Sequence, residues 1–286
     1  MEPIFGSRLS WNKLLPMDFS LTNVTRLCFV ASYAVALLLE LVRLLRAKPY
    51  WTWLSVAFGA SGLLAHTLFL IFRTPFVASP NGSLLLLAWV VAIFYLYGSV
   101  HHRQWAWAIF VLPLILVLVG LSGVVAPEQD DSSPRWFTGD TFWGAVHGSL
   151  LLLSAIGLCV ACVASVMYLV QANRVRNKAT FSEGLRLPSL ERLLQMNRRA
   201  INWAFPLLTT GLMLGVILLT QHGQAVWTTP KVFSTVGLWA AFALILYLRY
   251  SAAVSNRRLA VLTIAAFGLL LIALLSSHPV AGGGGW

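Results

Sequence analysis

Residues 143–171 read WGAVHGSLLLLSAIGLCVACVASVMYLVQ, a stretch without a lysine, arginine, aspartate or glutamate. A helix needs about 20 mostly apolar residues to cross the hydrocarbon core of a bilayer, and this stretch is long enough. Seven further stretches have the same apolar character. The eight expected spans are 24–45, 52–72, 84–100, 105–125, 143–171, 201–221, 233–250 and 258–277. We therefore predict an all-α fold, a polytopic membrane helical bundle of about eight transmembrane helices in a single domain over residues 1–286.

The overall composition supports this prediction. Hydrophobic residues make up 58% of the chain and charged residues only 10%, whereas soluble domains carry about a quarter charged residues. With so few charges a soluble fold could not cover its surface, so most soluble enzyme folds are excluded. The net charge of +11 does not indicate nucleic acid as a partner, because the sequence contains no soluble basic domain that could bind it.

Most of the basic residues gather in alternate connections between the expected spans, at 46–51, 101–104, 172–200 and 251–257. Membrane proteins place such connections in the cytoplasm. Both termini are then expected outside, with 1–23 as an extracytoplasmic segment and 126–142 as an acidic outer loop. Residues 172–200 are expected to form a basic cytoplasmic loop. The pattern predicts an integral protein of the bacterial cytoplasmic (inner) membrane.

Four histidines are expected near the outer side of this membrane. His147 lies near the start of its span, while His222 and His278 follow the ends of theirs. His66 lies about 22 Å along its span, in the outer half. Neutral imidazoles at one depth suit the ligation of a metal or of haem iron, although a single interfacial histidine more often only forms a hydrogen bond.

Two other local patterns have simpler interpretations. Gly211 and Gly215 form a G-x-x-x-G pair, which is typical of close helix packing in membranes. Cys159 and Cys162 form a C-x-x-C pair inside an apolar span, where buried free cysteines are common.

Several segments, taken in order, resemble one known family. They are HGSLLLLS at 147–154, LPSLER at 187–192, FPLLTTGLMLG at 205–215, PKV at 230–232 with Trp239, and His278. In this order the segments resemble the cytochrome c assembly family of haem-handling membrane proteins, with its CcsA, ResC and CcmC types. Within that family the chain is most similar to the HemX/YpjD-like branch.

The resemblance implies a haem site at the outer face of the membrane. His147 and His278 would be the axial ligands of the iron of a haem b, one from each side. Trp227, Pro230 and Lys231 would belong to the loop over the haem. The implied function is to assist cytochrome c maturation by presenting haem, in the lipid bilayer, with other cytochrome c maturation membrane subunits and apocytochrome c as partners.

Two departures from the family separate this chain from a full haem lyase. The histidine that the CcsA type has in the span after the loop is missing, and Tyr247 lies near that place. The tryptophan-rich loop is reduced here to His222-Gly-Gln-Ala-Val-Trp-Thr-Thr-Pro230, with Thr229 where the family has aspartate. We therefore do not expect a full haem lyase, and His66 and His222 are candidates for a compensating part of the site.

The alternative function is a non-enzymatic, HemX-like regulator or scaffold for haem biosynthesis, which would act through the basic cytoplasmic loop. The sequence shows no inverted repeat or pair of broken spans that would favour a solute transporter.

Overall fold

The computed structural model describes eight segments of the chain. They are residues 25–45, 49–73, 80–101, 106–124, 139–177, 187–221, 230–251 and 254–276. Each contains one helix, and no strand occurs in the described residues. The helices are α1 (Arg26–Leu45), α2 (Pro49–Arg73), α3 (Pro80–His101), α4 (Ala108–Val124), α5 (Gly139–Arg176), α6 (Leu190–Gln221), α7 (Pro230–Tyr250) and α8 (Asn256–Ser276).

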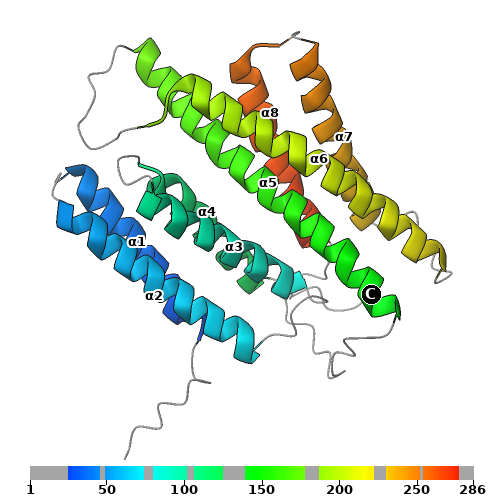
Figure 1. The fold of residues 1–286 in the computed structure, drawn as a ribbon, viewed down its shortest axis with the longest axis horizontal. Helices are drawn as coiled ribbons and strands as arrows, with labels where there is room; N and C mark the ends of the chain where they lie inside the picture. Colours follow the sequence, from blue (N-terminus) through cyan, green and yellow to red (C-terminus); the bar gives the residue numbers. More distant parts are fainter. Residues whose placement is uncertain are drawn as a thin grey trace, which may run out of the picture.

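These helices confirm the predicted all-α membrane fold. Seven of them are long and apolar enough to cross a bilayer. The eighth, α4, is apolar throughout but has only 17 residues, with Pro113 inside it. Successive helices run in opposite directions, so the bundle has two distinct ends (Figure 1).

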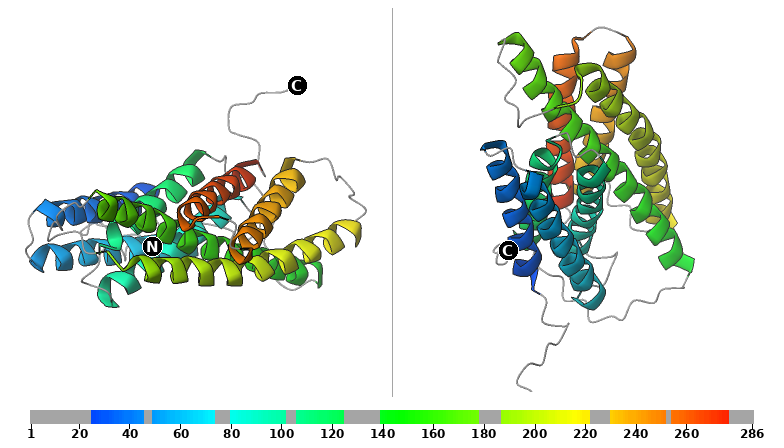
Figure 2. Two further views of the ribbon diagram at one scale, coloured as in Figure 1. Left: turned by 90° about the horizontal axis from the view of Figure 1, so that it is seen from above. Right: turned by 60° about the vertical axis from the view of Figure 1, so that its left-hand side comes forward.

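The helices pack mainly as neighbours in the chain: α1 with α2, α3 with α4, α5 with α6 and α7 with α8. Helices α1–α4 form one half of the molecule, and α5–α8 form the other (Figures 1 and 2). The two halves meet along a narrower seam, where α3 and α4 contact α5 and α3 contacts α8.

Helices α5 and α6 are longer than a bilayer requires. They have 38 and 32 residues, or about 57 and 48 Å at 1.5 Å per residue, against a hydrocarbon core about 30 Å thick. The expected loop over residues 172–200 is therefore wrong in extent, because helix covers 172–176 and 190–200.

The start of α6 explains this difference. Pro188 precedes it, the Ser189 hydroxyl oxygen accepts a hydrogen bond from the Arg192 backbone N–H at 3.4 Å, and Glu191 occupies the first turn. These features cap a helix at its N-terminus. Hydropathy alone misses such a start, because the first turns are polar.

Described arginines gather at the end of the bundle where α1 finishes and α2 begins. This arginine-rich end contains Arg43, Arg174, Arg176, Arg192, Arg198, Arg199, Arg249, Arg257 and Arg258. Arg26 and Arg73 lie at the opposite end. The distribution follows the pattern from which the sequence predicts the cytoplasmic side.

A buried polar cluster joins all four helices of the second half near the arginine-rich end. The Asn197 amide of α6 donates to the Ala161 carbonyl oxygen of α5 at 3.1 Å and to the Ser165 hydroxyl at 2.8 Å. It also lies 3.4 Å from the Thr263 hydroxyl of α8, and its own oxygen accepts a hydrogen bond from Arg249 of α7. The cluster favours one register of these helices, because Asn197 reaches its partners on α5, α7 and α8 together in this arrangement.

Candidate functional site

His147 lies on α5, near the end of the bundle opposite the arginine-rich end, and faces α6. Its Nδ1 atom is 2.7 Å from the Gly211 carbonyl oxygen. A carbonyl oxygen can only accept a hydrogen bond, so Nδ1 carries the proton and donates it. The neutral ring then has its lone pair on Nε2, which is the form of histidine that ligates a metal.

Two glycines of α6 make room for this ring. A Cβ atom on Gly215 would lie 2.6 Å from His147 Cε1, closer than non-bonded atoms can approach. A Cβ atom on Gly211 would lie 2.9 Å from Leu151 Cδ2, one turn further along α5. The structure thus confirms the predicted role of the G-x-x-x-G pair in close helix packing, and it shows that Gly215 seats His147.

His66 lies in a separate, fully buried pocket between α1 and α2. Its ring stacks on the Phe29 ring with 4.3 Å between centroids, and its Nδ1 atom is 3.5 Å from the Tyr33 hydroxyl. Its Nε2 atom is buried without a hydrogen-bond partner. Gly62 is again necessary, since a Cβ atom there would lie 2.9 Å from the Tyr33 ring.

The structure does not bring His66 and His147 together. His66 packs against α1 in the first half of the molecule, whereas His147 packs against α6 in the second. Helices α3 and α4 lie between α2 and α5 (Figure 1). His66 and His147 therefore do not share a site in this arrangement. The compensating role of His66 and His222 stays a prediction, because His222 lies outside the described residues.

The other candidate residues are only partly covered by the structure. His222, Trp227 and His278 lie outside the described residues. Pro230 is the first residue of α7, where its fixed φ angle favours a helix start, and Lys231 follows it in the first turn. Within the described residues, no group of three or more His, Cys, Asp or Glu side chains is placed to hold a metal ion.

Sequence reasoning missed the residues that position the two histidines. Phe29 and Tyr33 lie on the buried face of α1 and enclose His66. Gly215 is visible in the sequence as half of a packing motif, but the spacing does not reveal which side chain it accommodates. Only the pairing of α5 with α6 identifies His147 as that side chain.

Comparison with known proteins gives one family. The family model described as "Cytochrome C assembly protein" matches residues 78–282. Among curated proteins, "Cytochrome c biogenesis protein CcsA" of Guillardia theta is 24% identical over 243 residues, which cover 76% of this chain and 79% of that protein. The protein of the same name from Gloeobacter violaceus is 23% identical, with 70% and 75% covered.

A shorter match is to the CcsA protein of Prochlorococcus marinus (strain MIT 9313). It is 25% identical over 187 residues, which cover 56% of this chain and 59% of that protein. No solved structure matches the chain significantly. The described helices from α3 to α8, including the one that carries His147, lie within the matched range.

Proposed function

This chain belongs to the cytochrome c assembly protein family, and from that membership we propose that it binds haem and presents it at the outer face of the membrane. It is an integral membrane protein of cytochrome c biogenesis. In the proposal, His147 and His278 are the axial ligands of haem iron. Trp227, Pro230 and Lys231 cover the haem.

The observation that carries this proposal is the environment of His147, which sets its tautomer and its position against α6. Donation from Nδ1 to the Gly211 carbonyl oxygen puts the lone pair of the neutral ring on Nε2, which is the tautomer in which histidine ligates a metal. The missing side chain at Gly215 gives the His147 ring its place against α6, since a Cβ atom there would lie 2.6 Å from His147 Cε1. The residues present therefore fit a haem iron on this side of the site.

In this proposal the haem and the protein side chains have different roles. Haem supplies the redox chemistry when it is bound, while the protein supplies ligands and shields the site from water. His147 holds the iron from a rigid helix pair, and α7 positions Pro230 and Lys231 at the start of its first turn. Lys231 can offer a positive charge to a haem propionate.

The finer parts of the proposal concern cofactor, partners and location. We propose haem b, the bacterial cytoplasmic (inner) membrane, and a working complex with other maturation subunits and apocytochrome c. The relatives are named for cytochrome c biogenesis, which supports this setting. The reduced tryptophan-rich loop favours haem supply, as in a HemX-like branch, over covalent attachment.

The test is the visible absorbance spectrum of the protein purified in mild detergent, oxidised and reduced. We expect a low-spin haem spectrum that is lost in both His147→Ala and His278→Ala. The matched control is His66→Ala, which should keep the haem spectrum because its pocket lies in the other half of the molecule. His222→Ala tests whether that residue contributes to the site.

Two outcomes would overturn the proposal. One is a haem spectrum that survives both His147→Ala and His278→Ala. The other is an absence of haem even after haem is added to the purified protein. In the second case the non-enzymatic scaffold remains, and its sensitive residues would be the arginines at the opposite end of the bundle.

A further inference from the structure

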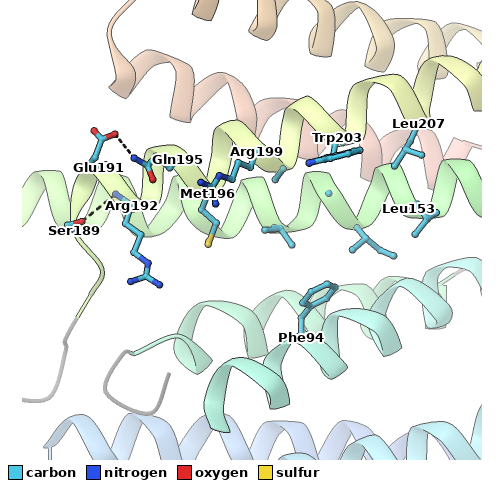
Figure 3. A pocket seen from close by; sticks show the side chains of 15 residues that line it. Phe94, Leu153, Ser189, Glu191, Arg192, Gln195, Met196, Arg199, Trp203 and Leu207 are labelled. Carbon is cyan, nitrogen blue, oxygen red and sulfur yellow. Dashed lines mark hydrogen bonds between the residues drawn. The ribbon is translucent and has the colours of Figure 1, made fainter. Parts of the chain in front are cut away.

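A groove lies along α5 and α6, on the side that faces α3. Its lining, as far as the structure describes it, contains none of the candidate haem-binding residues. It encloses about 890 Å³ at the seam between the two halves of the molecule, with Phe94 of α3 facing it. Figure 3 shows Phe94 directed across the groove toward α5 and α6. At its floor the two helices touch, since a Cβ atom on Gly157 would lie 2.8 Å from Ala204 Cβ.

The body of the groove is apolar and open to the bilayer. Trp203 is 75% exposed, Leu153 50% and Phe94 42%. In a membrane such surfaces face lipid, so the groove does not need a protein partner to be stable. The rest of this apolar part of the groove is lined by small or aliphatic side chains, including Val160 and Leu207.

One end of the groove is polar and positively charged. Arg192 and Arg199 line it from the same face of α6, two helical turns and about 10 Å apart. The one carboxylate among the described lining residues, on Glu191, accepts a hydrogen bond from the Gln195 amide at 3.1 Å. In Figure 3, Arg192 extends from α6 toward the side of the groove on which Phe94 lies.

The dimensions match one leaflet of a bilayer. From Arg199 to Leu207 the helix rises about 12 Å, and half of the hydrocarbon core is about 15 Å. The expected apolar span of this helix begins at residue 201, which places Arg199 and Trp203 near the headgroups and the aromatic interface, with the apolar floor below them. Arg192 lies further out, where a phosphate or its substituent would be.

We propose that this groove binds one anionic phospholipid from the leaflet at the arginine-rich end. Its phosphate lies against Arg192 and Arg199, and one acyl chain follows Gly157 and Leu207. The lipid fills the seam between α3 and α5–α6 and so stabilises the contact between the two halves. Haem is the less suitable occupant, because the lining residues that the structure describes include no histidine to ligate iron.

The experiment is native mass spectrometry of the full chain in detergent, with phosphatidylglycerol and phosphatidylcholine of identical acyl chains. We expect one tightly retained phosphatidylglycerol, preferred by roughly 30-fold, since each of two arginines near an anionic surface favours it about fivefold. The double variant Arg192→Gln/Arg199→Gln should lose that preference. The same lipid should raise the Tm of the parent protein and not of the variant.

The matched control is Arg257→Gln/Arg258→Gln, which removes two exposed arginines from the same end of the bundle but not from this groove. It should keep the preference. An equal loss in both double variants would overturn the proposal, because the attraction would then be a general surface effect. Displacement of the lipid by haem, or a dimer with no bound lipid, would overturn it in favour of those occupants.

Discussion

At the residue scale, the central feature is the exact complementarity between His147 and the glycine face of α6. The imidazole lies where a side chain of any size at position 215 would be, with 2.6 Å between His147 Cε1 and an ideal Cβ. The ring also donates to the Gly211 carbonyl oxygen. The orientation of His147 is therefore set by two backbone positions of the partner helix, and both can be probed without changing the histidine.

Gly215→Ala is predicted to impair haem retention while His147 is intact. The added methyl group must displace the imidazole, which costs about 1–3 kcal/mol of stability as an overpacking change and turns Nε2 away from its position. The measurement is haem content and spectrum of the purified variant. Gly237→Ala is the control, because a Cβ atom there meets nothing within 4 Å. Equal haem loss in both variants would show that the contact between Gly215 and His147 does not matter for haem binding.

A second prediction at this scale concerns His66. Its ring is stacked on Phe29 and buried, so His66→Ala should lower the Tm by removing a packed aromatic group. Its haem spectrum should equal that of the parent protein. A shift of the haem absorbance bands in this variant would show that His66 takes part in the site after all.

At the element scale, the second half of the molecule is held together by a polar cluster rather than by apolar packing alone. Asn197 is 4% exposed and satisfies groups from α5, α7 and α8. A buried polar network of this kind specifies helix register, because an apolar replacement leaves its partners without hydrogen bonds. Because α6 begins at its Ser189 cap, Asn197 lies two turns into the helix, level with its partners on α5 and α7.

Asn197→Leu is predicted to destabilise the protein by about 2–3 kcal/mol, because the partly buried Arg249 guanidinium loses its acceptor. The measurement is thermal denaturation in detergent, followed by the loss of helical circular dichroism. Asn202→Leu is the control, because Asn202 bonds the Tyr250 hydroxyl at 3.1 Å in an exposed position. Equal destabilisation by the two changes would contradict the role of the cluster.

At the scale of the whole molecule, the two ends of the bundle differ in charge and in chemistry. Most of the described arginines gather at one end, while His147 and His66 lie toward the other. Haem ligation and the attraction to anionic lipid are thus assigned to opposite ends. This separation depends on the orientation of the bundle in the membrane, which the positive-inside pattern predicts.

Reporter fusions test that orientation directly. Alkaline phosphatase fused after residue 286 should be active, because the C-terminus is expected outside, where its disulfides form. Green fluorescent protein fused after residue 178, in the connection between α5 and α6, should be fluorescent as a cytoplasmic domain. The reverse pair of results would invert the topology and place His147 at the cytoplasmic face.

The sequence by itself determined the class of fold, the approximate spans and the family. These depend on local composition and on ordered motifs, and a bilayer demands long apolar helices wherever they occur. It underestimated α5 and α6 at their polar ends, since capped helices such as α6 continue beyond the apolar stretch that hydropathy detects.

Only the tertiary structure decided which helices are neighbours and which side chains meet. In it His147 packs against Gly215, and His66 packs against Phe29 in the other half of the molecule. Asn197 accepts a hydrogen bond from Arg249. The physical reason is that helix pairing follows from the packing of side chains and from hydrogen bonds across helices far apart in the chain. Inside a bilayer hydropathy is nearly the same on all faces of a helix, so it cannot specify those partners.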